Sequence, residues 1–407
     1  MKTFGMRPRC PYTPVAPAGL MLAVLLLAPH AVCARDDQAT SSALDSSTRS
    51  ALDTALDEGF AASGMPGTTV GLWIPGHGSW IASRGVADLE TRRPMTPDLQ
   101  APIGSITKTF TGLIALHLVG QGSLRLDDTI DNWYPWIADA SLITVKMLMN
   151  HSSGIADIGQ QQVDLHCADP DHFVNPEQLI EIGAALPRAP FAPGDGFLYS
   201  STNTIILGRI LEKVTNKSYE SLISERLLEP LRLRRTKLDT EGRLDPPFSR
   251  GYTDFCPNLP PHTDTSRWVQ FSFAAGALAS TLDDLHAWGV ALGEGFGLTK
   301  KLRHARIDDV APGSNAGLGV VIQFDPRTNR VISLGHAGSE PGYSANVQYY
   351  TCSGAVWALI GNGDGGTGEA FVAVFNALRP VVESLVTSPS GCLDDRNEDT
   401  GNRKLRR

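Results

Sequence analysis

The segment GSITKTF, residues 104–110, places a serine and a lysine three residues apart at the start of an apolar stretch. Residues three apart on a helix share one face, so Ser105 and Lys108 would lie together. The first turn of a helix offers free N–H groups beside the serine oxygen. Apolar surroundings lower the pKa of an amine, which can then accept the serine proton. The pair predicts an activated serine nucleophile, and the alternative is a serine that only caps the helix.

Two later segments carry further groups that could take part. Tyr199 precedes a run of small polar residues and an apolar helix, and a tyrosine hydroxyl near a lysine can shuttle a proton. His336 ends a strand-like run, and Gly338 would let a ligand approach the strand edge, where the next N–H could face an oxyanion. Taken alone, the tyrosine and the histidine each have an ordinary structural interpretation.

The order of these segments resembles one family, the penicillin-recognising serine hydrolases. That family includes class C β-lactamases, serine D-Ala-D-Ala carboxypeptidases, D-aminopeptidases and related esterases. S-x-x-K lies early on a helix, Y-S-x follows a proline-rich loop, and H-x-G lies on a late strand. Other similar segments are GSLRLDDTIDNWYP (122–135), VKMLMNHSSGIADI (145–158), FAPGDGFLYSSTN (191–203) and AAGALASTLDDLHAW (274–288). The resemblance runs from about residue 50 to 386.

The resemblance implies roles for individual residues. Ser105 would be acylated, while Lys108 and Tyr199 would move the proton. The N–H groups of Ser105 and Ser339 would stabilise the oxyanion. The residues that the resemblance assigns to substrate binding are Ser201, His336, Gly338 and Ser339. It implies no metal and no organic cofactor.

Two positions depart from the family's commonest pattern and bear on the substrate. Ser201 stands where the family usually has asparagine, and His336 stands where class C β-lactamases have lysine. H-x-G is more usual in the peptidase and esterase branches, and a protonated His336 could meet a terminal carboxylate. We therefore expect a D-Ala-D-Ala carboxypeptidase-like enzyme acting on D-amino-acid peptides. The alternatives are a broad-specificity esterase, a β-lactamase, and a non-catalytic binding protein with this fold.

The elements that must position these residues follow from apolar patterning. Strands are predicted over 68–74, 79–87, 317–324, 330–336, 344–350 and 355–362. Helices are predicted over 50–60, from Ser105 onward, and over 368–386. We expect an α/β fold, a β-lactamase/transpeptidase-like sandwich of an antiparallel sheet with flanking helices plus a mainly helical subdomain. The predicted domain covers residues 45–388, with its sheet drawn from both ends and a helical insertion over about 110–315.

Both chain termini are predicted to lie outside this domain. Residues 1–34 combine positive charges with the short apolar run GLMLAVLLLA and small residues before position 35, which predicts a secretory signal. A membrane anchor and lipid attachment at Cys33 are the alternatives. Residues 389–407 have almost no apolar content and are predicted to be disordered. We therefore expect a periplasmic or secreted protein.

Charge and cysteine content limit the possible partners. Removing Lys2, Arg7 and Arg9 with the signal takes the net charge from −8 to −11, which disfavours nucleic-acid binding. We expect a small-molecule or peptide substrate and no stable membrane span, whereas the oligomeric state stays open. Four cysteines remain after position 34, and we predict the pairs Cys167–Cys256 and Cys352–Cys392. The polar segment LHCADPDH (165–172) is a possible metal site, but a loop with a disulfide-bonded cysteine is favoured.

Overall fold

A computed structural model describes residues 44–269, 272–365 and 370–387 of the 407-residue chain. The predicted signal over 1–34 and the predicted tail over 389–407 lie outside the described residues. The described residues include no helix whose length and apolar character would suffice to span a bilayer.

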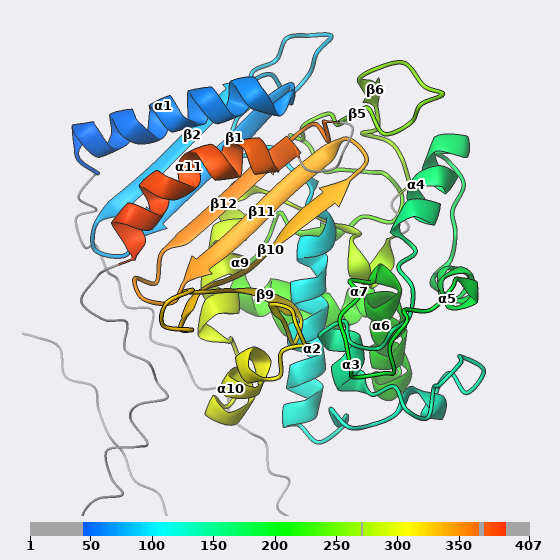
Figure 1. Ribbon diagram of the computed structural model, residues 1–407. Helices are drawn as coiled ribbons and strands as arrows, with labels where there is room; N and C mark the ends of the chain where they lie inside the picture. Colours follow the sequence, from blue (N-terminus) through cyan, green and yellow to red (C-terminus); the bar gives the residue numbers. More distant parts are fainter. Residues whose placement is uncertain (1–43, 270–271, 366–369, 388–407) are drawn as a thin grey trace, which may run out of the picture. The chain divides into compact units, whose positions relative to one another are not determined.

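A seven-stranded antiparallel sheet forms the centre of the fold, in the order β2-β1-β12-β11-β10-β9-β8 (Figure 1). Its strands are β1 (Gly67–Ile74), β2 (Gly78–Gly85), β8 (Ala316–Gly317), β9 (Val320–Phe324), β10 (Val331–Glu340), β11 (Tyr343–Tyr350) and β12 (Val356–Gly361). The pairing of β1 with β12, with Val70 opposite Leu359, joins an early strand to a late one. This sheet, with helices on its faces, confirms the predicted α/β fold class.

Helices cover both faces of the sheet, which explains why β1 is buried along nearly its whole length. On one face, α1 (Ser46–Ser63) and α11 (Ala370–Val386) lie side by side (Figure 1). Their apolar stripes pack against inward-facing strand residues such as Leu72 and Leu359. The opposite face receives α9 (Leu282–Glu294).

The middle of the chain is mainly helical. It contains α2 (Thr107–Gly120), α3 (Val145–Met149), α4 (Gly159–Ala168), α5 (Pro176–Ala185), α6 (Ser201–Thr215), α7 (Tyr219–Ile223), α8 (Glu229–Leu231) and α10 (Lys300–Asp308). Two small sheets join this region, β3 (Ala101–Pro102) with β7 (Leu278–Ser280) and β4 (Lys237–Leu238), and β5 (Tyr252–Thr253) with β6 (Thr263–Asp264). Helix α2 is central, because residues around its whole circumference are buried. Its Phe110 ring stacks on Trp288 of α9 at a centroid distance of 3.5 Å, which fixes α2 relative to the sheet.

A disulfide joins Cys167 in α4 to Cys256 after β5, with a Cα–Cα distance of 5.4 Å, so this predicted pair is confirmed. Its existence also removes Cys167 from any metal site in the segment 165–172. The neighbouring His166 places Nε2 2.8 Å from the Val269 carbonyl oxygen. The second predicted pair, Cys352–Cys392, cannot be followed, because Cys392 lies outside the described residues.

Candidate active site

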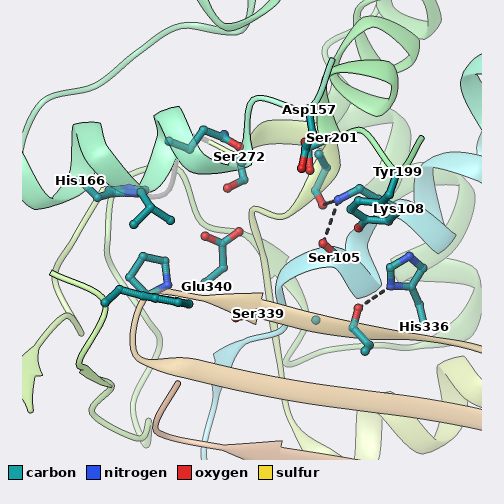
Figure 2. Close-up of a pocket in the computed structure, with 18 of the residues that line it drawn as sticks. Ser105, Lys108, Asp157, His166, Tyr199, Ser201, Ser272, His336, Ser339 and Glu340 are labelled. Carbon is teal, nitrogen blue, oxygen red and sulfur yellow. Dashed lines mark hydrogen bonds between the residues drawn. The ribbon is translucent and has the colours of Figure 1, made fainter. Parts of the chain in front are cut away.

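Ser105 and Lys108 are in direct contact. Ser105 lies in a 3₁₀ turn, Gly104–Ile106, that leads into α2, and Lys108 lies in the first turn of that helix. The Lys108 Nζ donates hydrogen bonds to Ser105 Oγ at 2.9 Å and to the Ala275 carbonyl oxygen at 2.8 Å (Figure 2). The serine side chain makes no capping hydrogen bond. The contact with lysine, rather than helix capping, therefore occupies the Ser105 hydroxyl.

Two glycines allow the Ser105 turn and strand β10 to touch through their backbones. Gly104 has φ +49°, and a Cβ on it would lie 2.5 Å from the Ser339 nitrogen. A Cβ on Gly338 would lie 1.9 Å from the Ile103 oxygen and 3.2 Å from the Ser105 nitrogen. The Ser105 and Ser339 amides are thus brought to the same place, beside the Ser105 hydroxyl.

Tyr199 and His336 join this group from two other parts of the chain. Tyr199 lies two residues before α6, and its ring centroid lies 5.1 Å from Lys108 Nζ. The His336 ring, on β10, lies 6.0 Å from the Tyr199 ring. On the other side, the His151 ring lies 4.7 Å from Tyr199, and His151 Nδ1 accepts a hydrogen bond from the Ser200 N–H at 3.2 Å. The three sequence motifs therefore converge on one site.

Both histidines at this site are uncharged at neutral pH. Burial, together with the nearby positive charge of Lys108, lowers the pKa of His336 to about 4. The same two causes, with a smaller effect of His336, lower the pKa of His151 to about 3. The His336 Nδ1 is hydrogen-bonded to the Ala337 carbonyl oxygen, which requires the proton on Nδ1. A protonated His336 that meets a substrate carboxylate, as considered from the sequence, does not fit this environment.

Ser201 is the first residue of α6 and lies at the cavity wall. Its N–H donates to Asp157 Oδ1 at 2.7 Å, so a carboxylate stands next to the position where the family has asparagine. Asn203 does not replace that asparagine, because it is fully buried in α6 and its Oδ1 accepts a hydrogen bond from Ser153 Oγ at 2.7 Å. The amide group typical of the family is therefore missing from this wall.

A cavity of about 570 Å³ opens over Ser105 (Figure 2). All the residues predicted for the site line it: Ser105, Lys108, Tyr199, Ser201, His336, Gly338 and Ser339. Two carboxylates line it as well, Asp157 and Glu340. Glu340 is the last residue of β10, and its burial raises its pKa to about 7 despite a hydrogen bond from Ser272 and the nearby Lys108 charge. Among the described lining residues, Lys108 is the only lysine or arginine.

Asp157, Glu340 and His151 were missed by the sequence analysis, although each lies close to a motif. Asp157 follows the SSGI turn, His151 begins it, and Glu340 comes two residues after Gly338. The alternation of side chains along β10 could have indicated that Gly338 and Glu340 share one face of the strand. Nothing in the sequence shows that Asp157 lies beside Ser201, because that contact depends on the fold of the helical region.

Known proteins with similar sequences point to one family. The Beta-lactamase family matches residues 52–379. A D-aminopeptidase of Brucella anthropi is 27% identical over 298 residues, which cover 72% of this chain and 55% of that protein. Penicillin-binding protein 4* of Bacillus subtilis is 26% identical over 286 residues, covering 66% of this chain and 62% of that protein. The chain thus spans little more than half the length of these relatives.

Solved structures give the same result. A D-stereospecific amidohydrolase from Streptomyces sp. superimposes with a TM-score of 0.70 at 28% identity, covering 80% of this chain and 97% of that one. The D-amino acid amidase from Ochrobactrum anthropi SV3 superimposes with a TM-score of 0.69 at 25% identity, covering 82% of this chain and 99% of that one. The family match spans most of the described residues and includes the entire site. The chain therefore belongs to the Beta-lactamase family, the penicillin-recognising serine hydrolases.

Proposed function

We propose that this protein is a serine hydrolase that removes an N-terminal D-amino acid from a short peptide or amide through an acyl-enzyme on Ser105. The observation that carries the proposal is the charge of the cavity. It presents two carboxylates, Asp157 and Glu340, beside the nucleophile, and the histidine nearest Tyr199 on β10, His336, is held neutral. Such a cavity favours a substrate with a free ammonium group over one with a free carboxylate.

The geometry supports a simple division of labour. Ser105 Oγ attacks the substrate carbonyl while Lys108 Nζ, 2.9 Å away and in its unprotonated form, takes the hydroxyl proton. The oxyanion lies against the Ser105 and Ser339 N–H groups, which the glycine contacts bring together. Tyr199, beside Lys108, passes the proton to the leaving amine. Water then hydrolyses the ester by the reverse sequence of proton transfers.

Asp157 is placed to recognise the substrate's α-ammonium group. One of its oxygens accepts the Ser201 N–H, which fixes the carboxylate at the cavity wall, and the side chain is only partly exposed. A charge-assisted hydrogen bond there would fix the distance between the free amino end and the carbonyl over Ser105. Such an arrangement selects the first residue of a chain rather than an internal one.

The similar proteins support the same substrate class. They include a D-aminopeptidase, a D-amino acid amidase and a D-stereospecific amidohydrolase. The carboxypeptidase activity expected from the sequence stays a prediction, and the same experiment tests it. Export also stays a prediction, since it depends on residues 1–34.

Hydrolysis of matched substrates tests the proposal. We expect the full-length protein to cleave D-alanine p-nitroanilide, with Ser105→Ala as the blank. N-acetyl-D-alanine p-nitroanilide should be cleaved about 10²-fold or more slowly, because it lacks the ammonium that the Asp157 carboxylate would bind. The proposal is wrong if the acetylated substrate is cleaved as well as the free amine, or if an N-blocked D-Ala-D-Ala peptide is the better substrate.

An esterase is the second candidate, and the missing amide at position 201 favours it. An ester has a better leaving group than an amide and needs less help from the residue at that position. A short-chain p-nitrophenyl ester and a chromogenic cephalosporin belong in the same assay. Turnover of the ester with none of the D-amide would favour the esterase.

A further inference from the structure

Glu340 forms a second anionic position in the cavity, separate from Asp157. It ends strand β10, whereas Asp157 precedes α4. In Figure 2 its carboxylate lies beside Ser272, on the other side of Ser105 from Tyr199 and His336, while Asp157 lies beside Ser201. The side chain is 8% exposed and still lines the cavity.

The surroundings of Glu340 hold it in place without neutralising it. Ser272 donates a hydrogen bond to it, and Gly276 leaves room for it, since a Cβ there would lie 2.2 Å from Glu340 Oε1. No ion pair to Glu340 occurs within the described ranges. Lys108 acts on it through its charge, but the Lys108 Nζ hydrogen bonds go to Ser105 and Ala275.

A carboxylate that is buried without an ion-pair contact is costly to a folded protein unless something pairs with it. Among the described residues Glu340 makes no hydrogen bond to Ser105 or Lys108, so the proton transfers proposed at Ser105 do not account for it. If Asp157 holds the substrate's α-ammonium, Glu340 is left facing the space for the rest of the acyl residue. An apolar side chain in that space would bury the carboxylate further and leave it unpaired.

We propose that Glu340 binds a positively charged side chain of the acyl residue, so that the enzyme prefers N-terminal D-amino acids with a second amine, such as D-lysine or D-ornithine. This inference rests on the proposed function of the same site. The cavity of about 570 Å³ is large enough for an extended lysyl side chain. Two anions facing two ammonium groups would also fix which end of the residue lies over Ser105.

Binding measurements in the full chain carrying Ser105→Ala test this without substrate turnover. The ligands are D-lysinamide and D-norleucinamide, which have the same aliphatic chain and differ in the terminal amine. At pH 8 we expect D-lysinamide to bind about 10–100-fold more tightly, the value of a charge-assisted hydrogen bond. Adding Glu340→Gln should reduce the ratio of the two affinities to about one.

The control is Glu220→Gln, which removes the same charge from an exposed position on α7 and should leave the ratio unchanged. Circular dichroism and thermal melting establish that Glu340→Gln is folded. Equal affinities before the substitution, absence of binding by both ligands, or a preference that survives Glu340→Gln would each overturn the inference. If the preference appears but the enzyme with intact Ser105 cleaves no D-amide, the proposed function fails and the cation site stands.

Discussion

The two faces of the large sheet are covered in contrasting ways. Beneath α1 and α11, the contact is dominated by large apolar side chains at helical and strand spacing, such as Leu56 and Leu72. On the opposite face, the Ser105 turn meets β10 through two glycines, and a lysine, two histidines and a glutamate are buried nearby. The first face contributes stability through apolar burial, while the second places ionisable groups where water would normally solvate them. The comparison separates a face that is covered mainly by apolar contacts from one that combines an apolar core, including Trp288 and Val347, with the groups that perform the chemistry.

Lys108→Ala should have the largest effect and should act on activity. Removing the group that takes the serine proton is expected to lower kcat/KM by about 10²–10⁴-fold. The measurement is hydrolysis of the best D-amide or ester, with covalent labelling of Ser105 by a reporter β-lactam as a second readout. Labelling at the rate of the unmodified protein would show that Lys108 is not the base.

Leu56→Ala should have the opposite effect, because it should lower stability and leave activity unchanged. Leu56 is a fully buried residue of α1, and its truncation is expected to lower the free energy of unfolding by about 2–5 kcal/mol. Activity per folded molecule should stay the same, because the site lies against the other face. Urea denaturation combined with active-site titration distinguishes a loss of stability from a loss of activity. A large fall in kcat would show that packing under α1 also affects the site.

Glu340→Gln should change how the free energy of unfolding depends on pH. The folded-state pKa of Glu340 is raised from 4.5 to about 7, so the unfolded chain ionises this group first. The unmodified protein should therefore lose stability as pH rises from about 4.5 to about 7. Glu340→Gln should remove that loss, a difference of about 3 kcal/mol above pH 7 that disappears below pH 4.5. Melting curves across this pH range test the prediction, with Glu220→Gln as control. A stability difference that stays constant with pH would contradict it.

Gly338→Ala adds only one methyl group and should have the smallest effect of the four substitutions. The new Cβ would overlap the Ile103 oxygen, so the strand and the Ser105 turn must separate. A displacement of the oxyanion donors by about 1 Å is expected to reduce kcat by about 10²-fold. Gly76→Ala is a useful control, because nothing lies within 4 Å of a Cβ there, even though its φ of +75° makes alanine unfavourable. Equal kcat in both variants would argue against a tight backbone contact at the site.

Several helices and strands were well predicted from the sequence. The segment 368–386 has apolar residues at helical spacing, and α11 spans Ala370–Val386. The strands over 68–74 and 344–350 agree with β1 and β11 to within a residue at each end. Such patterns are local, because the apolar residues of a half-buried helix or a buried strand recur at the spacing of that element itself.

The site was predictable only where a motif marks it. The serine, lysine, tyrosine and histidine motifs indicated the groups that converge, but they could not show that His336 is neutral or that Asp157 and Glu340 share the cavity. Protonation depends on burial and neighbouring charges, which come from residues far apart in the sequence. The expectation that His336 meets a carboxylate depended on a protonated imidazole, whereas burial lowers its pKa to about 4.

The disulfide between Cys167 and Cys256 has a topological consequence for the site. Its sequence separation is 89, and the covalent ring that it closes contains Tyr199 and Ser201 but neither Ser105 nor His336. Closing a ring of this size removes unfolded-state entropy worth about 4–5 kcal/mol at 25 °C. Both ends of the ring reach the cavity, since His166 and Phe255 line it next to the two cysteines. The ring therefore delivers Tyr199 and Ser201 as one tethered unit, which docks against Asp157, the nucleophile and strand β10, all supplied by the open parts of the chain.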